Sequence, residues 1–417
     1  MSMTRKWYRL AALAALVPFA ACSDVLSLDV EAPGRIADDD LYTIDAVPGM
    51  VSGMSYDLTQ AIDGILQELS LASLDIGHGG SYDFGAIPLG NFKAAVEDWN
   101  GSYNTMSQAR WVAEAGLRRI AEILPPASFE KDASVAKAYL LAGFANRLMG
   151  EVQCRVTIDG GPDVPHTEAF VRADSLFSRA ISVGTAAGQT NTVNAAYGGR
   201  ASVRAWQGRW AEAATDAAKV PLTFVWNTTF STALNNDMWY ETNTRREFSL
   251  YTVSWANVLN DPRVPWDKPV DSKGQPLKGQ DGQTIFYHQL KYKALDADVP
   301  LTHGAEMRVL QAEAALRNKD FAGAQTYLNQ ARSKWGMAPL TLSTNEAEAW
   351  ATLRFERYAT LFLEGRRLWD MRRWSVEGSP KADPAAAGRD LCFPISENEG
   401  RSNANVATYF GGCATCG

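Results

Sequence analysis

Apolar residues recur at helical spacing along most of this chain. From Leu58 to Leu69 one appears every three or four positions, which turns a single helix face toward a core. The same spacing predicts a helix from residue 92 until two prolines end it at 125–126, and further helices over 304–317, 321–335 and 346–374. The sequence therefore predicts a mainly α fold.

Two segments share a pattern typical of helix pairs. Residues 201–218 and 312–331 each contain an apolar helix, a polar three-residue turn, an aromatic residue and then small residues at helical spacing. A more degenerate third pair joins 135–151 to 170–183. Tetratricopeptide-like pairs pack in this way, because alanine and glycine let neighbouring helices approach closely. We expect a tetratricopeptide-like helix-pair superhelix built from pairs within 38–220 and 301–374.

Residues 221–300 interrupt the helical pattern. Proline, asparagine, aspartate and glycine punctuate this insert, and only short strands are predicted, for example at 248–253 and 284–287. Such a long excursion inside a helical body is usually functional. We interpret it as an irregular, loop-rich ligand-binding lobe of a single domain over 38–417, whose C-terminal tail occupies 378–417.

The N-terminus is typical of an export signal. A basic start precedes an apolar run from Leu10 to Ala21, too short to span a membrane, and Cys22 follows. Residues 19–22 (FAAC) resemble a bacterial lipobox, in which the cysteine becomes the lipid-bearing first residue. We predict a signal peptide over 1–21, lipidation at Cys22 and a tether over 22–37. The alternative is an ordinary signal peptide with a cysteine nearby.

Charge and composition limit the classes of partner that the protein can bind. The formal net charge is −7, and removal of the signal would take away three cations, whereas phosphate-binding surfaces need a basic excess. The hydrophobic fraction of 46% is that of a globular protein. We therefore expect no nucleic-acid partner.

Four cysteines remain beyond the signal: Cys154, Cys392, Cys413 and Cys416. In an oxidising compartment they allow three pairings, and the sequence does not choose between them. The spacing of Cys413 and Cys416 also suits half a zinc site or a redox pair, but no second such pair accompanies it. We expect a disulfide that pins the tail to Cys392 or Cys154.

Catalytic and metal-binding motifs are incomplete. The four histidines are not spaced as a helical zinc pair, residues 79–83 lack the last glycine of a nucleophile elbow, and 274–279 lack the lysine of a phosphate loop. Glu356 and Glu364 are predicted about two turns apart on one helix face, where flanking arginines favour structural ion pairs. The arginine-rich segment 366–374 is interpreted as a half-buried helix whose arginines lie at the rim or pair with acids. We predict no enzyme, no metal and no cofactor.

The C-terminal motifs resemble a known family. Residues 353–374 (LRFER, then LFLEGRRLWDMRRW), 393–399 (FPISENE) and the helix pair over 306–332 are similar to signatures of the SusD/RagB surface lipoproteins. The resemblance implies a tetratricopeptide-like scaffold with an irregular ligand-binding half, anchored in the outer membrane and facing the cell surface. It also implies docking on a SusC-like TonB-dependent transporter. Glycans are the usual ligand and peptides are bound in RagB-like branches, while the motif residues look architectural.

Aromatic residues in two loops suit a saccharide ligand, because flat rings cover the apolar faces of sugars while nearby amides and carboxylates bind the hydroxyls. The candidates are Tyr82, Asp83, Phe84, Asn236, Asp237, Trp239, Tyr240, Tyr251 and Trp255. The alternative is that these rings fill the core of a strand-poor lobe. We predict a non-catalytic lipoprotein that delivers an oligosaccharide to its transporter; peptide uptake and a tetratricopeptide-type protein–protein adaptor are the alternatives.

Overall fold

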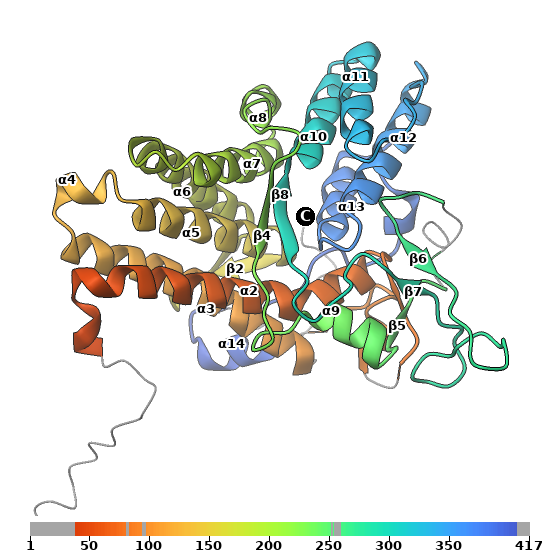
Figure 1. Cartoon of the computed structure of the whole chain (residues 1–417), viewed down its shortest axis with the longest axis horizontal. Helices are drawn as coiled ribbons and strands as arrows, with labels where there is room; N and C mark the ends of the chain where they lie inside the picture. The colour runs from red at the N-terminus through yellow and green to blue at the C-terminus, as the bar shows by residue number, and fades with distance from the viewer. Residues whose placement is uncertain (1–37, 81–82, 94–96, 252, 254–259, 407–417) are drawn as a thin grey trace, which may run out of the picture. The chain divides into compact units, whose positions relative to one another are not determined.

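Most of the described chain is helical, which confirms the predicted fold class (Figure 1). The structure is a computed structural model, and it describes residues 38–80, 83–93, 97–251, 253 and 260–406. The chain divides into two compact units, Met1–Tyr42 and Thr43–Gly417. The short helix η1 (Asp38–Leu41) belongs to the first unit, and all elements below belong to the second.

The helices of the second unit are η2 (Ile44–Ala46), α2 (Val47–Ala72), η3 (Asp83–Ala86), α3 (Glu97–Ile123), α4 (Pro126–Phe129), α5 (Ala133–Val152), α6 (Thr167–Ala186), α7 (Thr190–Trp206), α8 (Trp210–Ala217), α9 (Asp237–Trp239), η4 (Tyr240–Thr244), α10 (Gly304–Arg317), α11 (Phe321–Ser333), α12 (Glu346–Thr360), α13 (Arg367–Glu377), η5 (Pro384–Ala386) and α14 (Glu397–Ser402). The strands form two-stranded antiparallel ladders: β1 (Gly77–His78) with β5 (Phe248–Ser249), β2 (Arg155–Thr157) with β3 (Asp163–Pro165), β4 (Val225–Thr228) with β8 (Val299–His303), and β6 (Trp266–Asp267) with β7 (His288–Gln289).

Successive helices pack as pairs, α2 on α3, α5 on α6, α7 on α8 and α10 on α11. Small residues permit this packing where helices approach most closely. Phe177 of α6 fits against Gly143 of α5 and Gly199 of α7, where an added Cβ would lie 2.6 and 2.3 Å from its ring. The three helix pairs predicted from the small-residue pattern are therefore present.

The insert begins and ends at one ladder. Strand β4 lies just after its start and pairs with β8, which leads into α10 (Figure 1). The predicted strands are only partly right, since β5 covers just two residues of 248–253 and β7 starts one residue after 284–287. The ladder fixes both ends of the insert to the helical frame, and the segments between them are largely irregular.

The predicted single helix over 346–374 is wrong. Helix α12 ends at Thr360 and α13 starts at Arg367, because Leu363 and Gly365 have left-handed backbones with φ of 53° and 68°. Lys291 holds the break by donating to the Phe362 carbonyl and, at 2.7 Å, to Glu364. Glu364 therefore does not share a helix face with Glu356.

Arginines at the start of α13 and within it are buried: Arg366, Arg367, Arg372 and Arg373. Arg373 donates to both carboxylate oxygens of Glu313 on α10, at 2.5 and 2.7 Å. Arg366 pairs with Glu151 of α5 and Glu306 of α10, both at 3.1 Å. Buried charges are tolerated only when they are paired in this way. The predicted pairing with acids is confirmed for Arg366, Arg367 and Arg373, whereas Arg372 donates to the Gln153 carbonyl at 2.9 Å. The prediction that this helix is only half-buried is wrong, since all four arginines are buried.

Glu313 is the most heavily bonded acid of this network. It also accepts from Arg317 and from the Trp374 indole, at 2.8 and 2.9 Å. Burial alone would raise the pKa of Glu313, but the guanidinium groups around it, Arg373 first, hold that pKa well below its usual range. The carboxylate is thus kept ionised inside the protein.

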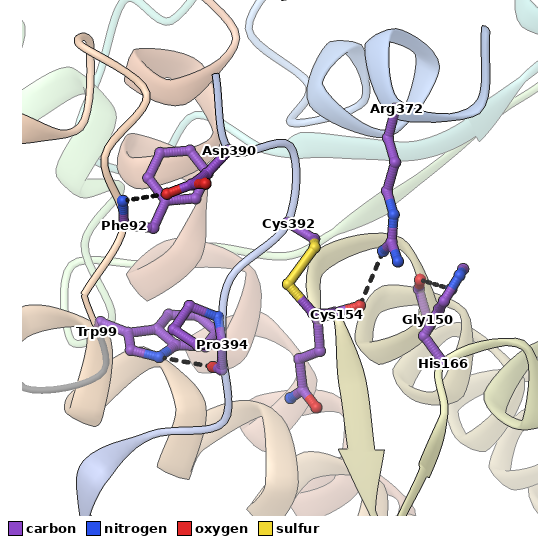
Figure 2. Close-up of a disulfide and its surroundings, with 10 residues drawn as sticks. Phe92, Trp99, Gly150, Cys154, His166, Arg372, Asp390, Cys392 and Pro394 are labelled. Atoms are coloured by element: carbon purple, nitrogen blue, oxygen red, sulfur yellow. Dashed lines mark hydrogen bonds between the residues drawn. A yellow bond between two sulfur atoms is a disulfide. The ribbon is translucent and has the colours of Figure 1, made fainter. Parts of the chain in front are cut away.

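The segment after α13 returns to the first half of the chain (Figure 2). Phe92 N donates to Asp390, and Trp99 Nε1 donates to the Pro394 carbonyl, both at 3.0 Å. Cys392 forms a disulfide with Cys154, 238 residues earlier in the sequence. The expectation that Cys154 or Cys392 pins the tail cysteines is therefore wrong, since the two bond to each other. Cys413 and Cys416 lie outside the described residues.

Loss of one charge in the network should destabilise the fold strongly. We expect Glu313→Gln to lower the free energy of unfolding by about 3–5 kcal/mol, because it leaves buried guanidinium charge uncompensated. Denaturant unfolding, monitored by circular dichroism, measures the change in the free energy of unfolding. The matched control is Glu346→Gln, whose 3.6 Å pair with Lys319 is exposed and should contribute less than about 1 kcal/mol. Equal losses in both variants would contradict this role for Glu313.

Candidate ligand-binding site

A pocket of about 500 Å³ lies where α2 and α3 meet the insert. Its volume falls in the usual range for small-ligand sites. Helix α2 packs on both α3 and α9, so this packing brings together segments that are far apart in the sequence. The lining residues are Gly64, Gln67, Glu68, Phe84, Asp98, Gly101, Ser102, Thr105, Asp237, Glu241 and Arg245.

The pocket joins the two predicted candidate groups. Phe84, from the first loop, and Asp237, from the insert, both line it. Phe84 is half-buried, and its ring packs edge-on against Phe248 at a centroid distance of 5.4 Å. Asp83 lies beside Phe84 in the turn η3. The sequence identified both loops, and the structure places one residue of each at the same pocket.

The remaining candidates predicted from the sequence near α9 and η4 lie outside the pocket lining. Asn236 is buried and caps α9, since its Oδ1 accepts from Trp239 N at 2.9 Å and its Nδ2 donates to the Ala297 carbonyl at 2.7 Å. Trp239 is half-buried against the core, and Tyr240 is exposed. None of the three lines the pocket, so a contact with ligand stays a prediction for them.

A second feature is a cluster of rings on the insert. Tyr251 and Tyr287 meet edge-on at 5.1 Å, and Trp266 lies tilted against Tyr287 at the same centroid distance. Lys268 Nζ lies 5.0 Å from the centre of the Tyr287 ring. Tyr251 is 41% exposed, while Trp266 and Tyr287 are half-buried. We call Tyr251, Trp266, Tyr287 and Lys268 the ring cluster; it offers a partly exposed aromatic surface beside a cation.

Helix η4 connects the pocket to the ring cluster. Glu241, within η4, lines the pocket, while Asn243 Oδ1 lies 2.5 Å from His288 Nε2 on β7, next to Tyr287.

Two candidates predicted from the sequence, Tyr82 and Trp255, lie outside the described residues, as does the predicted lipidation site Cys22.

Buried acids dominate the electrostatics of the pocket. Glu68 is 1% exposed; its Oε1 accepts from Ser102 Oγ at 2.8 Å, while its Oε2 has no hydrogen-bond partner. Burial raises the pKa of Glu68 to about 8, and the nearby Asp98 carboxylate adds to that rise. Burial likewise raises the pKa of Glu241 to about 7, although Arg245 opposes this rise.

A pair of aspartates supports the same wall. Asp63 Oδ1 accepts from the backbone N of Asp237 at 2.9 Å, and the two side chains hydrogen-bond each other. Burial first, and then the charge of Asp237, raise the pKa of Asp63 to about 8. Because two close carboxylates resist joint ionisation, the pair retains a proton near neutral pH.

The sequence did not identify several residues of this site: Glu68, Glu241, Arg245, Lys268 and Tyr287. A faint signal existed for Glu68, since it follows Ile65 by three positions on the apolar face of its helix. The others depend on how the irregular insert folds.

In the part of the chain that the structure describes, no three acidic, histidine or cysteine residues gather as a metal site. Of the helices in that part, none combines the length and apolarity needed to cross a bilayer.

Comparison with known families gives one match by sequence. Residues 289–411 match the family model described as the SusD family. This segment contains the arginine network of α13 and the disulfide cysteine Cys392. Among curated proteins, no relative matches the chain.

Solved structures show where else this fold occurs. A SusD/RagB family protein from Bacteroides thetaiotaomicron has 14% identity and a TM-score of 0.66, and the match covers 86% of this chain and 94% of that one. A SusD-like carbohydrate-binding protein from Bacteroides vulgatus has 12% identity and a TM-score of 0.63, with 87% and 97% covered. A SusD superfamily protein from the same species has 12% identity and a TM-score of 0.64, with 86% and 98% covered. At these identities the likeness shows the fold.

Ionisation of Glu68 should lower the stability of the folded protein. Its pKa is about 8 when folded, against an ordinary value of 4.5, so stability falls as the pH rises between these values. As the pH rises from 5 to 8, the free energy of unfolding of Glu68→Gln should increase relative to that of wild type by at least about 1.4 kcal/mol. This is the free energy that corresponds to a pKa shift of one unit. Denaturant unfolding at both pH values measures it. The exposed Glu122→Gln, on α3, should show no such gain; a pH-independent difference at Glu68 would contradict the assignment.

Proposed function

We propose that this chain, whose residues 289–411 match the SusD family model, is a SusD/RagB-type protein: a non-catalytic surface lipoprotein that binds an oligosaccharide. In this proposal the helix pairs form a rigid support, and the insert, together with the loop before α3, holds the ligand. The bound saccharide then passes to a SusC-like TonB-dependent transporter of the outer membrane.

The observation that carries the proposal is the ring cluster. Sugar rings present apolar C–H faces, which pack on aromatic side chains, and hydroxyls, which need polar partners. Tyr251, Trp266 and Tyr287 supply the aromatic surface, and Lys268 supplies a donor beside it. The pocket across η4 adds carboxylates that accept hydrogen bonds from hydroxyls. One related fold is described as a SusD-like carbohydrate-binding protein, which agrees with a saccharide ligand.

Membrane attachment is proposed through Cys22. The apolar run before it is too short to span a bilayer, whereas acyl chains on the cysteine would each contribute ~0.8 kcal/mol per buried methylene. Residues 22–37 would then connect the lipid to the folded body. This arrangement keeps the ligand-binding body at the membrane surface, where a transporter can receive the saccharide.

Removal of the exposed ring should weaken saccharide binding. We expect Tyr251→Ala to reduce affinity at least about fivefold, or about 1 kcal/mol, because central aromatic contacts carry much of the binding energy. Calorimetric titration with a panel of plant and bacterial oligosaccharides measures it. Tyr56→Ala removes an exposed tyrosine of α2 and is the control. Unchanged affinity in both Tyr251→Ala and Trp266→Ala would exclude the ring cluster as the site.

Lipid attachment has a direct test at Cys22. We expect the full-length protein, expressed in a bacterium that processes lipoproteins, to incorporate labelled palmitate and to sediment with membranes. Cys22→Ala should lose both the label and the membrane association, because the thiol is the acylated group. Ser23→Ala is the neighbouring control and should retain both. Label that persists in Cys22→Ala would place the acyl group on another residue, and a wild type without label would leave the ordinary signal peptide as the explanation.

A further inference from the structure

A second pocket lies on the helical frame, between α2, α5 and the strand β4 that opens the insert. Its volume is about 260 Å³, close to the lower end of the usual range for small-ligand sites. It has no lining residue in common with the pocket that contains Glu68, and no residue of the ring cluster lines it. We call it the frame pocket; it is a separate site on the molecule.

The frame pocket carries a positive charge that the protein does not pair. Among the described residues that line it, Lys137 of α5 is the only charged one, and this lysine is half-buried. In the described part of the chain no carboxylate forms an ion pair with Lys137. On its own helix the residues three and four positions away are uncharged: Ala133, Ser134, Leu140 and Leu141. A cation without a partner therefore lines this pocket of a protein whose net charge is −7.

Accessible polar and aromatic groups of β4 lie in the same lining. Asn227 and Thr229 are exposed, and Trp226 is half-buried. The pairing of β4 with β8 shifts register between Trp226 and Asn227, since Trp226 lies opposite Thr302 and Asn227 opposite Pro300. Irregularities of this kind re-aim side chains that regular alternation would turn to opposite faces. An indole and an amide that are adjacent in the sequence thus both contribute to one pocket.

The other walls of the frame pocket combine apolar and polar character. Leu58 of α2, Leu141 of α5 and Leu301 of β8 are buried and supply apolar surface. Ser55, one turn before Leu58 on α2, is half-buried and adds a hydroxyl. The pocket therefore offers an apolar base with hydrogen-bonding groups and a cation around it.

We propose that the frame pocket binds an acidic sugar residue, a uronic acid, whose carboxylate pairs with Lys137. The apolar face of a sugar ring packs on Trp226, and its hydroxyls meet the amide of Asn227 and the hydroxyl of Ser55. The ammonium group of Lys137 then forms a charge-assisted hydrogen bond with the carboxylate. This second site goes beyond the proposed function, because it does not involve the ring cluster.

Other ligands fit these groups less well. A neutral sugar leaves the charge of Lys137 unpaired, and a small inorganic anion leaves Trp226 and the leucines uncovered. Lysine is a point charge on a flexible stem, so it reaches a carboxylate without the fixed two-point geometry that arginine demands. At physiological ionic strength charges more than about 8 Å away are largely screened, so the acidic surface elsewhere does not prevent binding of an anion beside Lys137.

The test uses oligomers of galacturonic acid and of glucuronic acid, each paired with its carboxyl-reduced counterpart, in which an alcohol replaces every carboxylate. In calorimetric titration at pH 7 we expect wild type to bind at least one acidic oligomer at least about tenfold more tightly than its counterpart. Lys137→Met should reduce this preference to less than about twofold. Lys131→Met removes an exposed lysine just before α5 and is the matched control, which should keep the preference.

A second variant tests the strand wall of the frame pocket. Asn227→Ala changes an exposed side chain, and circular dichroism checks that the fold is retained. Its affinity for the acidic oligomer should fall about threefold, because one hydrogen bond to the sugar is lost. Unchanged affinity in Asn227→Ala together with a preference that survives in Lys137→Met would overturn the assignment of the site.

The outcomes distinguish this inference from the proposed function. Acidic oligomers that bind no more tightly than their reduced counterparts, while binding depends on Tyr251, would overturn the acidic-sugar site and leave the proposed function intact. An equal loss of preference in Lys131→Met and Lys137→Met would attribute it to overall charge and would also overturn the site. Lys137-dependent binding of an acidic peptide, with no binding of any oligosaccharide, would overturn both proposals.

Discussion

Pairing of buried charge is the constraint on which this structure depends. The arginines of α13 enter the protein interior, and each must meet an acid or a carbonyl there because an unpaired charge is too costly. Their partners lie on different elements: Glu313 on α10, Glu151 on α5 and the Gln153 carbonyl after α5. One helix thus fixes the first and second halves of the chain to each other.

The pocket stands in contrast to this network. In the network, Glu313 is buried among guanidinium groups, and they hold its pKa well below its usual range. In the pocket, Glu68 is buried beside Asp98 and Ser102 with no cation that lowers its pKa, so that pKa rises to about 8. A frame stabilised elsewhere can tolerate such a site.

Much of the frame could be predicted from the sequence, because helix periodicity and small-residue spacing are local signals. The ion pairing of the α13 arginines was also predictable from their apolar neighbours. The break at Leu363 was not, since it depends on Lys291 reaching across from the insert. The pocket combines residues of 64–68, 98–105 and 237–245, and only its tertiary contacts make Glu68 differ from an ordinary surface acid. Local patterns do not contain that information.

The disulfide between Cys154 and Cys392 has a consequence for synthesis and export. Its two ends are 238 residues apart in the sequence. The covalent bond therefore cannot close until the chain has been made at least as far as Cys392 and both cysteines have reached an oxidising compartment. A chain that stops before Cys392 has no partner for Cys154, so such a product would carry a free thiol that distinguishes it from the disulfide-bonded protein.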